Sequence, residues 1–479
     1  MAATVVRQAD WAIVWNAQSR RHVYRRGVDI AFADGSLSFI GKSYGGAAAR
    51  EIDGRRLFVL PGLIDIHSHP EHEPAYRGIR EEHGLANMYM SGLYERTQAF
   101  ASPDDEARAA NAEFAYCELL LSGVTALVDI SPAWDGWIEL FARSGLRGFL
   151  APGYASARWR LDNDFELKFA WDEARGRAGF AAALRLVEAA AKHPSGRLSG
   201  VLSPMQIDTC TADLLRDSFE AARERKLPFT VHAAQSVNEV QEMIRRHGKT
   251  PIQWARDIGI LGPETILGHA LFLDSHSWIR WWSRTDLRIL AESGCSIAHC
   301  PTPFARYGQV MEDFGAYLRA GINMGLGTDT TPHNMIEEMR KAAVLARIAA
   351  RDIHAVTTAD LFHAATVGGA TALGRADLGR LAPGAKADLV LVDLASPGMA
   401  PARDPLRSFV YHAADRAVRH VFIDGQQVVE DGRVLTLDRE GAAERLTRAQ
   451  QRIMATAPAR DYRRRSADEI APLSLPLEG

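Results

Sequence analysis

Short apolar runs alternate with helical stretches through the middle of the chain. Eight apolar runs are predicted as strands, at residues 60–69, 124–130, 147–154, 198–206, 228–232, 265–273, 295–299 and 322–329. The segments between them carry Ala, Leu, Glu and Arg at helical spacing. Eight strand and helix alternations over about 270 residues are typical of a closed (β/α)8 TIM barrel. An open doubly wound sheet rarely needs so many regular units.

The two ends of the chain have a different pattern. Residues 1–60 contain short apolar runs separated by turns such as Asp34-Gly35. Residues 376–436 have the same pattern, with turns at Asp424-Gly425 and Asp431-Gly432. Such runs predict antiparallel strands. We therefore expect an α/β protein with a barrel over residues 61–375 and a small β-sandwich built from both chain ends. Residues 437–479 are expected to form a solvated terminal helix and a loose tail.

Composition narrows the class of protein. The 479 residues are 47% hydrophobic and 24% charged, with a net charge of −3. These values are ordinary for a folded domain and provide no basic field for nucleic acid or an anionic membrane. Four scattered cysteines form no CxxC pair, and no apolar stretch approaches the ~20 residues of a membrane helix. We expect a cytoplasmic protein that acts on a small molecule.

Histidines stand at the ends of several predicted strands. His67 and His69 are two residues apart, so they face the same side of the first strand. His232 ends the fifth strand, His269 lies in the sixth, and Asp329 ends the eighth. Because the carboxyl ends of barrel strands open onto one face, these side chains are expected to meet there. Three imidazoles and one carboxylate suit a single divalent metal. The alternative is a set of hydrogen-bonded, partly buried histidines.

Several motifs resemble the amidohydrolase superfamily, in particular its branch of cytosine and guanine deaminases, adenosine-type deaminases and s-triazine hydrolases. They are Pro61 to Asp65 before the histidine pair, Arg77-Gly78, Gly123 to Thr125, Ala298 to Pro301, Gly325 to Asp329, Ala364 to Thr366, and Leu381 to Val390. The last motif begins the return of the chain into the small β-domain of that family. The resemblance covers nearly the whole chain.

This resemblance implies a ligand set. His67, His69, His232 and Asp329 would bind the metal, and His269 would contact the attacking water or the substrate. Relatives with two metals bridge them through a lysine on the fourth strand, and residues 198–210 contain none. One ion is therefore expected, with zinc favoured over iron, although either suits three nitrogens and one oxygen.

The position three residues after His232 departs from the deaminase pattern. Deaminases carry a proton-shuttling glutamate there, whereas this chain has Gln235, which cannot transfer a proton. With Asp329 and His269 as the other catalytic residues, the change favours an amide, urea or carbamate substrate such as a phenylurea. The alternative is an aminohydrolase or dechlorinase of a pterin, purine or s-triazine, with Glu71, His72 or Glu73 supplying the acid. An inactive barrel scaffold is a remote third reading, because the expected ligands are all present.

Loop residues close to the predicted metal are candidates for substrate contacts. They are His72, His83, His333 and Asn334, all placed where loops follow strands. Cys300 is not expected to act as a nucleophile, because no base is paired with it in the sequence. A homodimer is expected, since dimers are common for such folds.

Overall fold

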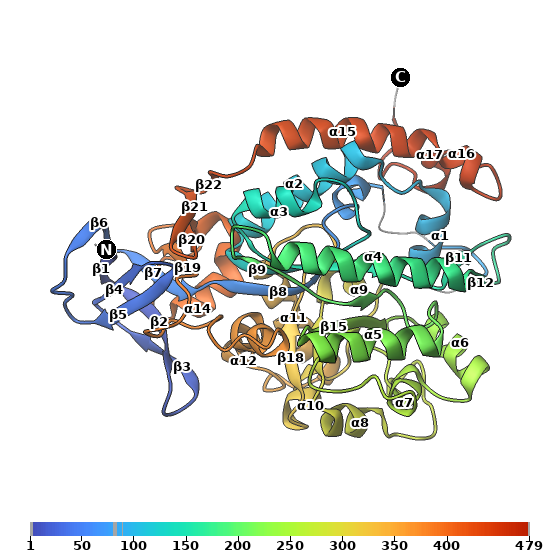
Figure 1. The fold of residues 1–479 in the computed structure, drawn as a ribbon, viewed down its shortest axis with the longest axis horizontal. Coiled ribbons are helices and arrows are strands. Elements are labelled where there is room, and N and C mark those ends of the chain that lie inside the picture. The colour runs from blue at the N-terminus through green and yellow to red at the C-terminus, as the bar shows by residue number, and fades with distance from the viewer. Residues whose placement is uncertain (1–2, 80–83, 89, 478–479) are drawn as a thin grey trace.

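The computed structural model describes residues 3–79, 84–88 and 90–477. Two β-sheets at one end of the molecule adjoin a larger α/β body (Figure 1). His83 lies outside the described residues. Within the described part of the chain, no helix combines the length and apolar composition needed to cross a bilayer.

Strands from both chain ends build the smaller, β-rich part. Its first sheet has the order β5-β4-β1-β6 and its second the order β22-β21-β20-β19-β7-β2-β3. Their bounds are β1 Ala3–Ala9, β2 Trp11–Asn16, β3 Arg21–Arg25, β4 Val28–Ala33, β5 Ser36–Gly41, β6 Ala48–Asp53, β7 Leu57–Pro61, β19 Leu389–Asp393, β20 Val418–Ile423, β21 Gln426–Glu430 and β22 Arg433–Val434. The apolar faces of the two sheets share one buried cluster that includes Ile30, Phe32, Leu389 and Phe422.

Parallel strands form the core of the larger part. One sheet has the order β13-β10-β9-β8, with β14 paired to β10, and the other has the order β15-β16-β17-β18. Their bounds are β8 Leu63–Ser68, β9 Val124–Ser131, β10 Arg147–Tyr154, β13 Leu198–Gly200, β14 Ser203–Pro204, β15 Phe229–Ala233, β16 Thr265–His269, β17 Ser296–His299 and β18 Asn323–Leu326. A separate hairpin joins β11 Ala157–Arg160 to β12 Lys168–Trp171.

Isolated parallel bridges join these two sheets at both seams. Leu202 and Gln206 meet Phe229 and His232 at one seam, and Ser68 meets Asp329 at the other. The strands thus follow one another in the order predicted from the sequence, and regular ladders are confined to the two separate sheets. The irregular seams lie where the chain places residues of the predicted metal site.

Three predicted strands differ clearly from the observed ones. The run 60–69 is divided between β7 and β8, because Pro61 pairs with Leu389 in the β-rich part while Leu63 turns into the parallel sheet. Gly62 at the break packs so closely on Thr125 that a Cβ atom would lie 2.0 Å from its Oγ1. The run 198–206 is broken into β13 and β14, and the sixth strand ends at His269 rather than at residue 273.

Helices cover the outside of the parallel sheets (Figure 1). The helices are α1 Gly92–Ala99, α2 Asp105–Leu121, α3 Trp137–Ser144, α4 Glu173–Ala191, α5 Ala212–Arg225, α6 Val237–His247, α7 Pro251–Asp257, α8 Asp286–Ser293, α9 Pro301–Arg306, α10 Phe314–Arg319, α11 Met335–Ala350, α12 Thr358–His363, α13 Gly369–Ala372 and α14 Pro405–Ser408. Short 3-10 and π segments are η1 Glu73–Tyr76, η2 Ala364–Gly368, η3 Phe409–Ala413 and η4 Ala414–Ala417.

The C-terminal segment is more firmly packed than the expected solvated helix and loose tail. It contains α15 Arg439–Ala455, α16 Ala457–Arg460 and α17 Ala467–Ile470. Leu446, Ile453 and Ile470 are buried in a cluster with Ala75 and Tyr76 from the loop after β8. The end of the chain therefore supports the loop that follows the predicted metal ligands.

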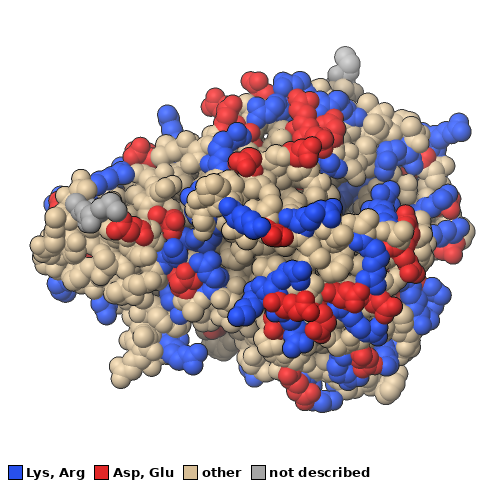
Figure 2. All heavy atoms as spheres, in the orientation of Figure 1, with Lys and Arg blue, Asp and Glu red and all other residues tan. Residues whose placement is uncertain are grey.

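Charged side chains are distributed without separation by sign on the face shown in Figure 2, where basic and acidic groups are interspersed. Exposed charges of the molecule also pair at short distances, such as Arg288 with Glu292 at 3.1 Å. Exposed pairs of this kind contribute about 0.2–1 kcal/mol each. This face thus offers no uniform positive surface.

Candidate metal centre

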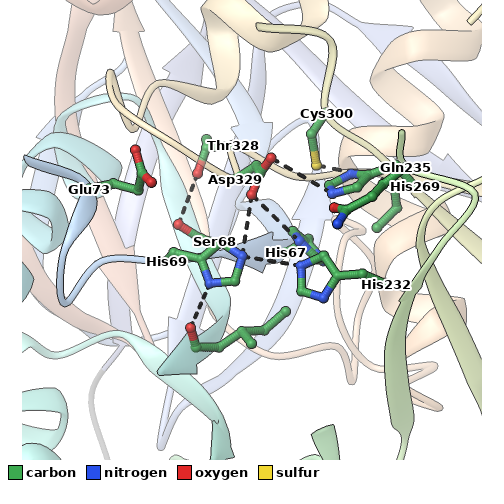
Figure 3. Close-up of polar contacts among 12 residues, drawn as sticks. His67, Ser68, His69, Glu73, His232, Gln235, His269, Cys300, Thr328 and Asp329 are labelled. Atoms are coloured by element: carbon green, nitrogen blue, oxygen red, sulfur yellow. Dashed lines mark hydrogen bonds and ion pairs between the residues drawn. The ribbon is translucent and has the colours of Figure 1, made fainter. Parts of the chain in front are cut away.

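Four histidines and one aspartate converge where the parallel strands end (Figure 3). Nitrogen atoms of His67, His232 and His269 lie within 4.8 Å of one another, and so do ligand atoms of His67, His69 and Asp329. The Asp329 carboxylate joins both groups. Its Oδ1 lies 3.3 Å from His69 Nε2 and 3.6 Å from His67 Nε2, and its Oδ2 lies 3.7 Å from His269 Nε2.

Backbone carbonyls orient two of the imidazoles. His69 Nδ1 lies 2.7 Å from the carbonyl oxygen of Ile130, and His232 Nδ1 contacts the carbonyl oxygen of Met205. An Nδ1–H bond to a carbonyl leaves Nε2 as a free lone pair, which is the form a metal ligand requires. The two Nε2 atoms lie 3.3 Å apart. The two Nε2 lone pairs therefore point into the same space and repel each other. A cation bound between them would remove this repulsion.

Buried nitrogen atoms give a second test of the fit. Neither ring nitrogen of His67 has a hydrogen-bond partner among the described residues, although the side chain is fully buried. Buried polar atoms are nearly always paired with a protein group, a water or an ion. The donor set of imidazole nitrogens and one carboxylate is the one that zinc and iron accept. The residues present thus fit a divalent metal.

Burial keeps the imidazoles neutral. It lowers the pKa of His67, His69 and His269 well below the usual value, and that of His232 to about 4. Burial also raises the pKa of Asp329 to about 8, with a further contribution from the charge of Glu73. Neutral imidazoles do not have to lose a proton before they bind a cation.

Asp65 connects the two segments that carry three of these residues. Its carboxylate accepts hydrogen bonds from the His67 backbone N–H at 3.0 Å, the Thr328 N–H at 3.2 Å and the Thr328 hydroxyl at 2.6 Å. The Asp329 N–H donates in turn to the His67 carbonyl oxygen at 2.8 Å. Asp65 was predicted only as part of a motif, with no role of its own, although the two-residue alternation that pairs His67 with His69 also places it on the same face.

His72 lies beside the cluster, as predicted for a loop residue. Its ring centroid is 5.5 Å from that of His69, and its nitrogens lie 2.9 Å from Glu71 Oε1 and 3.3 Å from Glu73 Oε1. Burial lowers the pKa of His72, but the charges of both glutamates outweigh this effect and raise it to about 9. Glu73 also pairs with the buried Arg96. These ionisable side chains therefore form a network along one side of the site.

Other predicted substrate contacts are placed differently. His333 has no exposed surface, and its Nδ1 lies 3.7 Å from Glu118 on α2. The Asn334 side chain caps α11 by accepting hydrogen bonds from the N–H groups of Ile336 and Glu337. Cys300 is buried, and this burial raises the pKa of its thiol well above the usual range.

The expected catalytic glutamine belongs to a pair of amides. Gln235 Nε2 donates to Gln206 Oε1 at 2.8 Å, and both side chains are buried. Figure 3 shows Gln235 next to the histidine cluster. Gln206 was not identified from the sequence, because its partner is 29 residues away and only the parallel approach of the two segments brings them together.

Comparisons with known proteins agree with this geometry. Residues 58–428 match the sequence profile described as Amidohydrolase family. The chain is 30% identical over 403 residues to a 5-methylthioadenosine/S-adenosylhomocysteine deaminase of Natronomonas pharaonis, a match that covers 83% of this chain and 87% of that protein. It is 28% identical over 430 residues to a 5'-deoxyadenosine deaminase of Methanosarcina mazei, covering 89% and 93% of the two chains.

Two solved structures share the fold at lower sequence identity. An adenosine deaminase from Xanthomonas campestris with bound zinc has a TM-score of 0.81 at 22% identity, covering 95% of this chain and 99% of that one. The atrazine chlorohydrolase TrzN from Arthrobacter aurescens TC1, in complex with zinc, has a TM-score of 0.78 at 23% identity, covering 93% and 100%.

Proposed function

The chain belongs to the amidohydrolase family, and we propose that it folds as a closed (β/α)8 barrel and acts as an aminohydrolase on a nitrogen heterocycle. Its family makes it a metal-dependent hydrolase of carbon–nitrogen bonds. The observation that carries the finer proposal is the convergence of four imidazoles on Asp329, in a chain whose relatives of 28–30% identity are adenosine-type deaminases. An inactive scaffold would have no need to keep this cluster intact.

We assign one divalent ion, zinc before iron, to His67, His69, His232 and Asp329. The orphaned nitrogens of His67 and the facing lone pairs of His69 and His232 support this assignment. A bound divalent ion lowers the pKa of a coordinated water toward 7 and so supplies hydroxide at neutral pH.

Asp329 and His269 supply the protein's share of the chemistry. The Asp329 carboxylate lies among the imidazoles, where it can take a proton from the attacking water and pass it to the leaving amine. His269, 3.7 Å from Asp329 Oδ2, faces the same space and can donate a hydrogen bond to the charge that develops on the substrate. The net reaction replaces the amino group by a hydroxyl and releases ammonia.

Ring deamination also needs a proton at a ring nitrogen, which Gln235 cannot supply. The loop after β8 provides ionisable groups instead, because His72 contacts Glu71 and Glu73 next to His69. We place the proton delivery on this loop.

An amide, urea or carbamate substrate, such as a phenylurea, is the second candidate. The neutral Gln235 favours it, because attack on a polarised carbonyl needs no ring protonation. We rank this reading second, because the two relatives described above, at 30% and 28% identity, are a 5-methylthioadenosine/S-adenosylhomocysteine deaminase and a 5'-deoxyadenosine deaminase.

The test is a substrate panel with metal-replete enzyme. Adenosine-type nucleosides, pterins, amino- and chloro-s-triazines, aryl ureas and anilides are incubated, and the released group is identified by mass. We expect ammonia from at least one aminated heterocycle, loss of activity with a chelator, recovery with zinc, and a loss of more than about 10³-fold in Asp329→Ala. His247→Ala, a histidine at the end of α6 outside the cluster, serves as the control. Turnover confined to ureas or anilides would overturn the proposal.

A further inference from the structure

We propose that Gln206 and Gln235 together bind a planar edge of the substrate that carries a hydrogen-bond acceptor beside a donor, such as the amidine or lactam edge of a nitrogen heterocycle. The inference rests on the proposed function and names the feature of the ring that is recognised. It makes Gln206 a specificity-determining residue and gives Gln235 a role other than proton transfer.

The hydrogen-bonding capacity of the pair is incompletely used. Each primary amide offers two N–H donors and a carbonyl oxygen with two lone pairs. The contact between Gln235 Nε2 and Gln206 Oε1, at 2.8 Å, uses one donor and one acceptor. The Gln206 amide nitrogen and the Gln235 carbonyl oxygen have no other hydrogen bond to the described residues. Exchanging O and N in both amides would still leave one carbonyl oxygen and one NH2 group, so the pair presents a donor and an acceptor either way.

The two side chains are largely buried, while their free amide atoms keep some contact with solvent that a bound ligand would displace. Gln206 is 8% exposed and Gln235 5% exposed. A buried polar group left without a partner costs about 1–3 kcal/mol. A ligand that meets both groups is therefore favoured over one that covers them with apolar atoms, and this difference is the basis of discrimination.

The backbone fixes Gln235 in place. Both oxygens of Glu239 accept backbone hydrogen bonds, Oε1 from the Ala234 N–H at 2.6 Å and Oε2 from the Gln235 N–H at 3.1 Å. Ala234 has a φ of 54°, in the left-handed region, so the chain turns sharply just before Gln235. Ser236 then caps α6 through the Glu239 N–H and contacts the buried Tyr94 hydroxyl at 2.7 Å. The amide is thus held on a rigid turn.

Gln206 is fixed from the neighbouring segment. It forms a parallel bridge with His232, and the next residue, Ile207, donates its N–H to the His232 carbonyl oxygen at 3.0 Å. The two glutamines therefore flank a proposed metal ligand from two adjacent segments. A ring bound to both amides would be positioned relative to His232 and the reacting centre.

The pair is neutral at every accessible pH, which separates it from a carboxylate at the same place. It can orient a neutral ring edge, and it adds no ionisation to the reaction. We therefore expect the two side chains to act on binding and discrimination and not on the pH profile.

The test compares ligands that differ at one ring atom. Affinities are measured for two ligand pairs, adenosine with 1-deazaadenosine and 2-aminopyrimidine with aniline, in the zinc-loaded wild type and in Gln206→Met and Gln235→Met. A ligand that is turned over is compared by its KM, and one that is not is compared by its dissociation constant from calorimetry. In the wild type we expect at least one parent ring to bind about tenfold or more tightly than its partner. Each variant should lose that preference while its affinity for the deaza or benzene partner stays within about threefold.

Two further variants complete the design. Gln253→Met alters a buried glutamine on α7 that bonds to Asp286, and it should leave the preference intact. Gln235→Glu should add an ionisation to the pH dependence of binding that the wild type lacks. The proposal is overturned if the wild type discriminates within neither pair, or if the preference survives in both methionine variants. A preference without any turnover of heterocycles would overturn the proposed function and leave the amide pair standing.

Discussion

Asp65 is predicted to control metal affinity without touching the metal. Replacing it by asparagine keeps one carbonyl oxygen but places an NH2 group opposite the Thr328 N–H and hydroxyl, which now donate to Asp65. At least one buried donor of Thr328 loses its acceptor, which costs about 1–3 kcal/mol. These bonds hold the end of β8 against the segment that carries Asp329. When they are weakened, His67 and Asp329 are held less firmly in position, and part of the lost free energy is lost from metal binding.

Groups that orient metal ligands typically change affinity by about 10–100-fold when altered, which corresponds to roughly 1.4–2.7 kcal/mol. We expect Asp65→Asn to weaken zinc binding within that range, measured by competition with a chromogenic chelator. Thr328→Val removes only the hydroxyl contact and should have a smaller effect.

A matched control separates metal affinity from general stability. Asp286 is also fully buried, and it accepts hydrogen bonds from the Thr250 hydroxyl at 2.8 Å and the Gln253 amide at 3.0 Å, away from the cluster. Asp286→Asn should lower the thermal midpoint and leave the zinc dissociation constant within about twofold of wild type. Equal zinc affinity in Asp65→Asn and the wild type would refute the reasoning, since the ligands would then be positioned without the Asp65 bonds.

Two other predictions concern the periphery of the site and the β-rich part. The Gln450 side chain donates to the carbonyl oxygens of Ala75 at 2.8 Å and Arg77 at 2.7 Å. Gln450→Leu should therefore destabilise the loop after β8 by about 1–3 kcal/mol, measured as faster proteolysis of that loop at unchanged zinc content. An unchanged rate of proteolysis would contradict this prediction. Burial lowers the pKa of His22 to about 3, so the unfolded chain takes up its proton first as the pH falls below about 6.5, and stability decreases. His22→Asn should therefore lose up to about 2 kcal/mol less than the wild type between pH 7 and pH 5 in urea unfolding, and equal losses would show that His22 does not contribute.

The order of strands and the residues that meet at their ends could be predicted from the sequence. The reason is local: apolar runs of strand length stop at a polar residue, and parallel strands in sequence order present those residues at one edge. The prediction over 147–154 matches β10 residue for residue, and 228–232 matches β15 to within one residue at each end. His67, His69, His232, His269 and Asp329 converge accordingly.

Features that depend on distant partners were beyond the sequence. The run 60–69 is apolar throughout, so nothing local shows that Pro61 pairs with Leu389 while Leu63 joins another sheet. The packed C-terminal helices were expected to be solvated, because their few apolar residues meet a surface that only the folded loop after β8 provides.

The chemistry of the site divides in the same way. The sequence by itself determined which side chains were available: imidazoles and a carboxylate that suit a metal, and a glutamine at the position where the resemblance to deaminases implies an acid. Only the tertiary structure decided that this glutamine shares its amide with Gln206 and that Asp65 connects the two ligand-bearing segments. Hydrogen bonds of this kind depend on separations of about 3 Å between segments far apart along the chain, and those separations are fixed by packing rather than by local pattern.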